Sequence, residues 1–285
     1  MCCNSSNSAV SAIPSANIIA RQAFAYSINT DEYNKIANYG LLQKAEGPFG
    51  PGTLGYLPNT GLPTYNPTKA KQLAQQYTAA THQPLSFSYQ TTDDPESLKD
   101  AQLVQKYVQN AGMQMTIKQV DEATLINYAS AGTFQISAWR NHPGFDPDTQ
   151  YVWWHCATAP AATGGATNVG TGDATHVTGN NCDNLVNFSK FNDAKINKDL
   201  DAGRTSNDPA VRKAAYEDLN REFAKQLWEA WGYYALWTMP YQTNIRGLLG
   251  PNLPTESSPD ASASGAAPFQ GLSSGDDVSG LWIKK

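Results

Sequence analysis

The chain has 285 residues, of which 40% are hydrophobic and 16% are charged, and its net charge is −5. This negative charge gives no electrostatic reason to expect a nucleic acid as partner, because nucleic-acid-binding surfaces are basic. No run of about 18 apolar residues is present, so we expect no helix that spans a membrane.

The beginning of the chain resembles neither a folded segment nor a signal peptide. Residues 1–14 are largely polar and contain neither a basic region nor an apolar core. We therefore expect residues 1–14 to be irregular and the chain to begin within a larger protein.

The first expected elements are helices. Residues 15–28 place apolar side chains on one side, and a second helix is expected to start near Thr30. The Gly- and Pro-rich stretch 47–63 predicts turns. A further helix is expected after Asn66, which can cap it, with Pro67 at the first helical position.

Strand and helix patterns then alternate as far as Trp139. The expected strands are 85–89, 113–120 and 134–139; the helices between them run from a cap at Asp94 to Gly112 and from a cap at Asp121 to Gly132. Strands that are joined through helices are parallel, and their crossovers are right-handed. The sequence therefore predicts an α/β fold with a parallel βαβαβ unit and flanking helices.

Two cysteines flank an insert without hydrophobic periodicity. Cys156 and Cys182 lie on either side of the Gly-, Thr- and Ala-rich stretch 157–181, which we expect to be disordered. A disulfide between Cys156 and Cys182 would close this insert in an oxidising compartment. Two unrelated free thiols are the alternative.

The longest expected helix begins at Asp208-Pro209 and runs to about Trp231. Glu217 and Arg221 are spaced for an ion pair on its surface. Its apolar stripe consists of Val211, Ala215, Leu219, Phe223 and Leu227. The stretch 251–268 contains many Pro, Ser and Ala residues and predicts a linker.

The loop after Trp139 follows the carboxyl end of the third expected strand, where open parallel sheets bind ligands. Asp146 and Asp148 in this loop either cap the next helix or act as paired carboxylates. Two carboxylates so close in sequence seldom flank a scissile bond, so capping is the favoured interpretation. Dinucleotide, P-loop and nucleophile-elbow motifs are lacking, which weighs against the common enzyme classes.

A metal site is a further candidate in this region. His142, His155, Cys156 and His176 are close in sequence, but metal ligands need fixed spacing on rigid elements. His176 lies in the insert, and Cys156 is better used in a disulfide. We therefore expect neither a metal nor a cofactor, and we interpret His142 as a hydrogen-bonding residue of the surface or a cleft.

Trp139 has two alternative roles at the end of its strand. The indole either packs in the core or forms a rigid apolar wall for a ligand. In the second case Arg140 and Asn141 would bond to polar groups of that ligand, since a guanidinium pairs well with carboxylates. The other tryptophans that we weighed are interpreted as structural: Trp153, Trp154, Trp228, Trp231 and Trp237.

The order of these segments resembles the extracytoplasmic solute-binding proteins of ABC importers. More narrowly, it is similar to the family that includes dipeptide-, oligopeptide- and nickel-binding proteins. The helix with Arg21-Gln22-Ala23 and the helix that begins YNPTKAKQL resemble that family best, and the closing GDDVSGLWIKK resembles its C-terminal end. The resemblance covers nearly all of residues 15–250. It implies a type II periplasmic-binding-protein-like fold, in which two lobes close on a ligand by a hinge.

The resemblance implies that members of that family are about twice as long as this chain, so the chain resembles a C-terminal half. The resemblance implies that residues 15–250 form the second lobe. Residues 269–285 would then be a tail that returns to the first lobe. A signal peptide or lipid anchor would lie upstream, and the protein would work outside the cytoplasm, peripheral to the membrane.

The resemblance also implies a ligand-binding loop, with one departure. In peptide-binding relatives an acidic residue three positions after the Trp holds the amino group of the peptide, whereas this chain has His142 there. Asp146 could substitute if the loop bends suitably. Arg140 and His142 instead favour a carboxylate or a hydroxyl-rich ligand.

Three functions remain open on these observations. The leading hypothesis is a binding protein without catalysis that delivers a small solute, such as a peptide, to the permease subunits of an ABC importer. Its ligand residues would be Trp139, Arg140, Asn141, His142 and Asp146. The second is a secreted hydrolase that acts on glycans or peptides through Asp146, Asp148 or His142. The third is a scaffold that has lost ligand binding.

Overall fold

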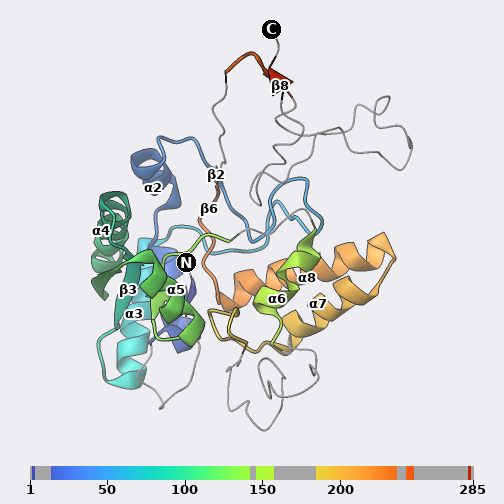
Figure 1. Ribbon diagram of the computed structural model, residues 1–285. Coiled ribbons are helices and arrows are strands. Elements are labelled where there is room, and N and C mark those ends of the chain that lie inside the picture. Colours follow the sequence, from blue (N-terminus) through green and yellow to red (C-terminus); the bar gives the residue numbers. More distant parts are fainter. Residues whose placement is uncertain are drawn as a thin grey trace.

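The structure is a computed structural model that describes residues 2–3, 14–141, 146–156, 184–235, 242–246 and 282–283. Two parts of the chain pack against each other (Figure 1): an α/β part from residues 14–141 and a helical part mainly from residues 146–156 and 184–226. Within these described ranges, no helix combines the length and apolar character needed to cross a membrane.

A four-stranded sheet with the order β1-β5-β3-β4 forms the centre of the α/β part. β3 pairs parallel with β4 along its length and parallel with β5 over two positions, whereas β1 is antiparallel to β5. The predicted parallel βαβαβ unit is therefore confirmed. The strands are β1 (Cys2–Cys3), β3 (Ser86–Thr92), β4 (Gln114–Val120) and β5 (Ile136–Ser137).

β5 is shorter than the strand expected at 134–139. Phe134 packs with Ala129 and Phe188 in a small apolar cluster of its own. The Ala138 amide still donates to the Gln90 carbonyl over 2.9 Å, and then the chain leaves the sheet. Trp139 lies against the Phe188 cluster instead of continuing the ladder. The early end of β5 therefore sets the point where the candidate ligand loop begins.

Three helices of the α/β part begin where their capping residues predict. The side chains of Asn66, Asp94 and Asp121 each accept a hydrogen bond from a backbone amide of the first turn. Gly132 closes the last of these helices at φ 66°, a left-handed conformation that suits glycine. The helices are α1 (Ile18–Ser27), α3 (Pro67–Thr81), α4 (Pro95–Asn110) and α5 (Glu122–Ala131).

The two faces of the sheet have different neighbours. Phe87 and Tyr89 of β3 belong to the main core, together with apolar residues of α1, α3 and α4. The alternating residues point the other way. There Ser88 bonds to Gln135, and Gln90 bonds to the Thr133 carbonyl beside α5.

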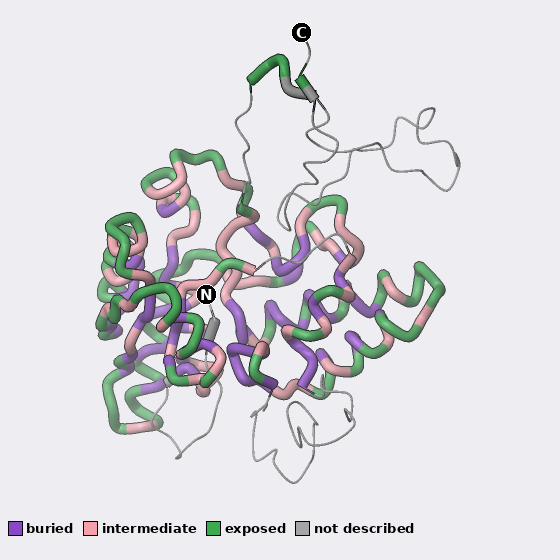
Figure 2. Tube along the Cα trace, in the orientation of Figure 1, coloured by how far each residue is buried: buried purple, intermediate pink, exposed green. Residues whose placement is uncertain are grey.

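The helical part consists of η2 (Pro147–Gln150), α6 (Tyr151–Trp154), α7 (Ala194–Thr205) and α8 (Pro209–Gln226). Figure 1 shows α7 and α8 side by side, with α6 against them. Their core is aromatic and includes Phe49, Trp154, Tyr216 and Phe223, all at most 1% exposed. In Figure 2 the turn between α7 and α8 is exposed, while β3 and β5 at the centre of the sheet are largely buried.

α8 is shorter than the helix expected to reach about Trp231. It ends at Gln226 because Leu227 adopts a left-handed conformation with φ 55° and buries its side chain. Val211 is 45% exposed, so its place in the predicted buried stripe was wrong. The expected pair of Glu217 and Arg221 is present at 3.6 Å.

Short ladders join segments that are distant in sequence. β2 (Gln43–Lys44) follows α2 (Thr30–Ala37) and pairs antiparallel with β6 (Tyr233–Tyr234), and β7 (Ile245–Arg246) pairs with β8 (Trp282–Ile283). The remaining element is a short helix, η1 (Pro14–Ala16).

Arg21 ties the two parts of the molecule together. Its guanidinium is buried and donates to the carbonyls of Ser15, Ala16 and Gln226 over 2.8–3.0 Å. It also lies 4.0 Å from the centre of the Trp228 ring. The charge is therefore satisfied by carbonyl dipoles and an aromatic face, and the end of α8 is fixed to α1.

Several predicted segments lie outside the described residues. They are most of the irregular start 1–14, the insert 157–181 with His176, the linker 251–268, and the tail 269–285 apart from β8. These assignments stay predictions.

Candidate functional site

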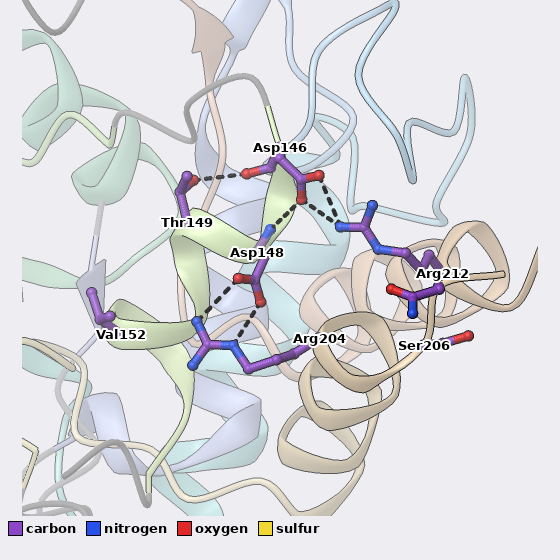
Figure 3. A pocket seen from close by; sticks show the side chains of 8 residues that line it. Asp146, Asp148, Thr149, Val152, Arg204, Ser206 and Arg212 are labelled. Carbon is purple, nitrogen blue, oxygen red and sulfur yellow. Dashed lines mark hydrogen bonds and ion pairs between the residues drawn. The ribbon is translucent and has the colours of Figure 1, made fainter. Parts of the chain in front are cut away.

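An open hollow of about 420 Å³ lies between η2 and the turn that joins α7 to α8. Figure 3 shows its walls, where two carboxylates of η2 and its cap face two arginines of the helices. The lining residues are Asp146, Asp148, Thr149, Val152, Arg204, Ser206, Asn207 and Arg212.

Asp146 is a capping residue that also pairs with an arginine. Its Oδ1 accepts from the Asp148 amide over 2.9 Å, which fixes the start of η2. Arg212 Nη2 lies 2.6 and 2.8 Å from its two carboxylate oxygens. Burial would raise the pKa of Asp146, but the hydrogen bonds from Arg212 and the Asp148 amide outweigh it and leave the pKa lowered. The predicted capping role of Asp146 is confirmed.

Asp148 forms the second carboxylate–guanidinium pair. Arg204 donates to its two oxygens through Nε at 2.9 Å and Nη2 at 3.1 Å, a bidentate arrangement. The Arg204 guanidinium also stacks 3.6 Å from the centre of the Tyr151 ring, and Tyr151 donates to Asp201 over 2.8 Å. The hydrogen bond to Asp148 raises the pKa of Arg204, so this arginine stays charged.

This arrangement does not favour acid–base catalysis at the two aspartates. A general acid needs a carboxyl with a raised pKa, whereas Asp146 has a lowered one. Both side chains are engaged by arginines on neighbouring helices, and they do not face each other across an open gap. The hydrolase hypothesis therefore gains no support from the geometry.

Trp139 lies at the carboxyl edge of the sheet and is half-buried. Its ring meets the Phe188 ring edge to face, with centroids 4.6 Å apart. The indole thus packs against the Phe188 cluster and is not part of the main core. Arg140 is exposed beside it, and Asn141 is half-buried.

Asn141 is held by a residue of η2. Its Nδ2 donates to the side-chain oxygen of Gln150 over 2.8 Å, and Gln150 is 0% exposed. This bond brings the start of the loop next to η2, so Trp139, Asn141 and Asp146 lie in one region. His142 lies outside the described residues.

The candidate metal ligands have other partners where they are described. His155 stacks on Tyr151 at 4.4 Å, its Nε2 lies 3.3 Å from Asp201, and burial lowers its pKa. Cys156 is disulfide-bonded. Cys182 lies outside the described residues, so the pairing of these two cysteines stays a prediction. Within the described ranges no group of three His, Cys, Asp or Glu side chains is placed to hold a metal.

Residues 6–163, more than half of the chain, match the model of the bacterial extracellular solute-binding proteins, family 5. This chain belongs to that family. Its fold is that of a type II periplasmic-binding-protein lobe, as the solved structures below also show.

Relatives of this family 5 chain include binding proteins for different solutes. It is 25% identical to the di/tripeptide-binding protein 2 of Pseudomonas aeruginosa (strain UCBPP-PA14) over 73% of its own length and 35% of that protein. It resembles DppA of Helicobacter pylori, solved with the peptide STSA, with a TM-score of 0.65 and 20% identity; the match covers 84% of this chain and 42% of DppA. It also resembles NikZ of Campylobacter jejuni, solved with Ni(L-His), with a TM-score of 0.63 and 16% identity; this match covers 82% of this chain and 45% of NikZ. The chain thus spans less than half the length of each.

Three residues that hold the candidate site of this family 5 chain were not predicted from the sequence. Arg204 and Arg212 pair with aspartates that lie 56 and 66 residues earlier, and Gln150 was not singled out at all. No local spacing predicts such pairs. The only available signal was the surplus of carboxylates in Asp146-Pro147-Asp148, which implied cationic partners elsewhere.

Proposed function

We propose that this family 5 chain is the substrate-binding component of an ABC importer, which captures a small solute and delivers it to the permease. The solute class that fits best is a peptide, since the relatives above include peptide-binding proteins. The protein would act outside the cytoplasm and peripheral to the membrane, and it would catalyse no reaction.

The observation that supports this proposal is the half-buried indole of Trp139 at the carboxyl edge of the parallel sheet. Open sheets of this kind bind ligands at that edge. A rigid aromatic face that is fixed by Phe188 offers apolar contact at little entropic cost. Arg140 and Asn141 follow directly and supply charge and hydrogen bonds.

We assign the remaining predicted residues as follows. Arg140 and Asn141 contact polar groups of the solute, and His142 tunes specificity. The carboxylate of Asp146 is engaged by Arg212, so we propose that Asp146 shapes the loop and influences the solute indirectly.

A thermal-shift screen tests this function. The chain is heated with di- and tripeptides, free amino acids, sugars and nickel–histidine, and a binding protein should be stabilised by a small chemically related set. Stabilisation by peptides that Trp139→Ala abolishes would support the proposal. Stabilisation by no class, or release of cleaved peptide, would contradict it.

A further inference from the structure

Gln150 is a fully buried polar side chain beside the candidate ligand loop. It is the last residue of η2, it is 0% exposed, and its side-chain oxygen accepts from Asn141 Nδ2 over 2.8 Å. Burying an amide is costly unless its groups find partners. An apolar residue of similar size would avoid that cost, so the amide calls for an explanation.

The hydrogen bonds around Gln150 run in one direction. The Thr149 hydroxyl lies 2.8 Å from the Asp146 carbonyl. Because a carbonyl can only accept, the hydroxyl must donate this hydrogen bond, and it has a single proton to donate. Thr149 Oγ1 must therefore accept from Gln150 Nε2, which lies at 3.4 Å. The Gln150 oxygen is then left facing Asn141, so Asn141 must present its Nδ2 to it.

These hydrogen bonds form a relay that runs from Asn141 through Gln150 and Thr149 to Asp146, and its last acceptor is held in place. The Asp146 carbonyl accepts the hydrogen bond from Thr149. The Asp146 carboxylate is held by Arg212 through two contacts of 2.6 and 2.8 Å. Arg212 also donates through Nε to the Gly203 carbonyl over 2.9 Å. Arg212 thus ties Asp146, the residue that accepts from Thr149, to α8.

We propose that Gln150 is a positioning residue, which fixes the Asn141 amide with Oδ1 turned away from η2 to accept an N–H from the solute. This inference rests on the proposed function. An amide oxygen has two lone pairs, so it can take a solute N–H in addition to a partner within the chain. The site would then select solutes with N–H donors, ammonium or amide, over those with acceptors only.

The test uses the 285-residue chain with trialanine as the probe. Gln150→Met removes the amide at similar volume, Asn141→Ala removes the group that it orients, and the double variant combines both changes. Gln150→Met should weaken binding roughly three- to tenfold, the range expected for one hydrogen bond. If Gln150 acts through Asn141, the double variant should bind no more weakly than Asn141→Ala alone.

Two further variants separate positioning from general damage to the fold. Gln105 is a second glutamine whose side-chain amide is hydrogen-bonded within the chain, donating to the Met115 carbonyl over 2.8 Å, but it lies on α4. Gln105→Met should leave trialanine binding unchanged. Thr149→Val cuts the relay at an exposed position, so it should fold even where Gln150→Met does not, and it should also weaken binding.

The side-chain NH₂ signals of Asn141 in a ¹⁵N-correlated spectrum give an independent readout. The proton bonded to Gln150 should resonate downfield, and both Gln150→Met and Thr149→Val should move it. If trialanine does not bind the parent chain, the proposed function fails for this probe, while the spectrum still tests the relay. Additive losses in the double variant, or Asn141 signals that do not move, would overturn the inference.

Discussion

The hollow beside Asp148 and the loop start beside Trp139 share one short helix, η2, but they use their polar groups differently. In the hollow, two carboxylates and two guanidiniums neutralise each other at hydrogen-bond distance. At the loop start, an aromatic face and an amide are held by a neutral contact and an edge-to-face ring pair. The difference supports our proposal that a solute binds at the edge beside Trp139, whereas the paired charges of the hollow fix η2 to α7 and α8.

The largest expected loss of stability follows truncation of a tryptophan, Trp154 in the core of the helical part that bears the hollow, compared with Trp139 at the loop start. Trp154 is 1% exposed and touches Phe223 and Trp231 with ring centroids 4.8 and 6.2 Å apart. Trp154→Ala should reduce the free energy of unfolding by about 3–5 kcal/mol, as for a large core truncation. Trp139→Ala should cost only about 1–2 kcal/mol, because its side chain is half-buried. Urea unfolding curves measure both, and equal losses would contradict the distinction.

The next effect concerns a carboxyl that has no arginine partner in the described part of the chain. Glu229 is 9% exposed, and burial raises its pKa from 4.5 to about 7, although it also accepts a hydrogen bond from Trp154. Because the carboxyl pKa is higher in the folded state than in the unfolded state, ionisation of Glu229 destabilises the folded state. This loss of stability is complete above pH 7 and absent below pH 4.5.

Glu229→Gln should therefore stabilise the chain as the pH rises. We expect the variant to gain about 2–3 kcal/mol over the parent at pH 9 and nothing at pH 4. Unfolding curves across this range measure the gain. A variant that is less stable than the parent at pH 9 would show that the Glu229 charge is compensated.

A smaller difference in stability is expected between variants of the two arginines on α8. Arg212 pairs with the half-exposed Asp146, and its removal should cost about 1–2 kcal/mol, as for hydrogen bonds to a charged group. Arg221 lies on the exposed face of α8, where it and its nearer partner, Asp218 at 2.7 Å, are both half-exposed, and Glu217 is 3.6 Å away. Arg221→Ala, the matched control, should cost less than about 0.5 kcal/mol. Equal costs would mean that the Asp146 pair is an ordinary surface ion pair.

Much of the α/β part could be predicted from the sequence, because its signals are local. Asn66, Asp94 and Asp121 cap helices within three residues of themselves, and alternating apolar residues indicate strands. The end of α8 could not be predicted, because Leu227 takes a left-handed conformation that its sequence neighbours do not demand.

The candidate site was only half predictable, for a related reason. Trp139 and Asn141 follow from the end of a strand, which is a local feature. The partners that hold them, Phe188 and Gln150, and the arginine that holds Asp146 come from other elements, so only packing reveals them. Sequence patterns therefore predicted the position of the proposed solute site, but not the residues that hold its side chains in place.

The most direct test follows the indole N–H signal of Trp139 during a peptide titration. Trp139→Phe assigns this signal by its loss, and a peptide that stabilises the chain in the thermal-shift screen is then added. The proposed site predicts that the Trp139 signal shifts with the same saturation curve as the stabilisation, while the buried Trp154 and Trp228 signals stay in place. A peptide that stabilises the chain without moving the Trp139 signal would place the solute elsewhere and contradict the account.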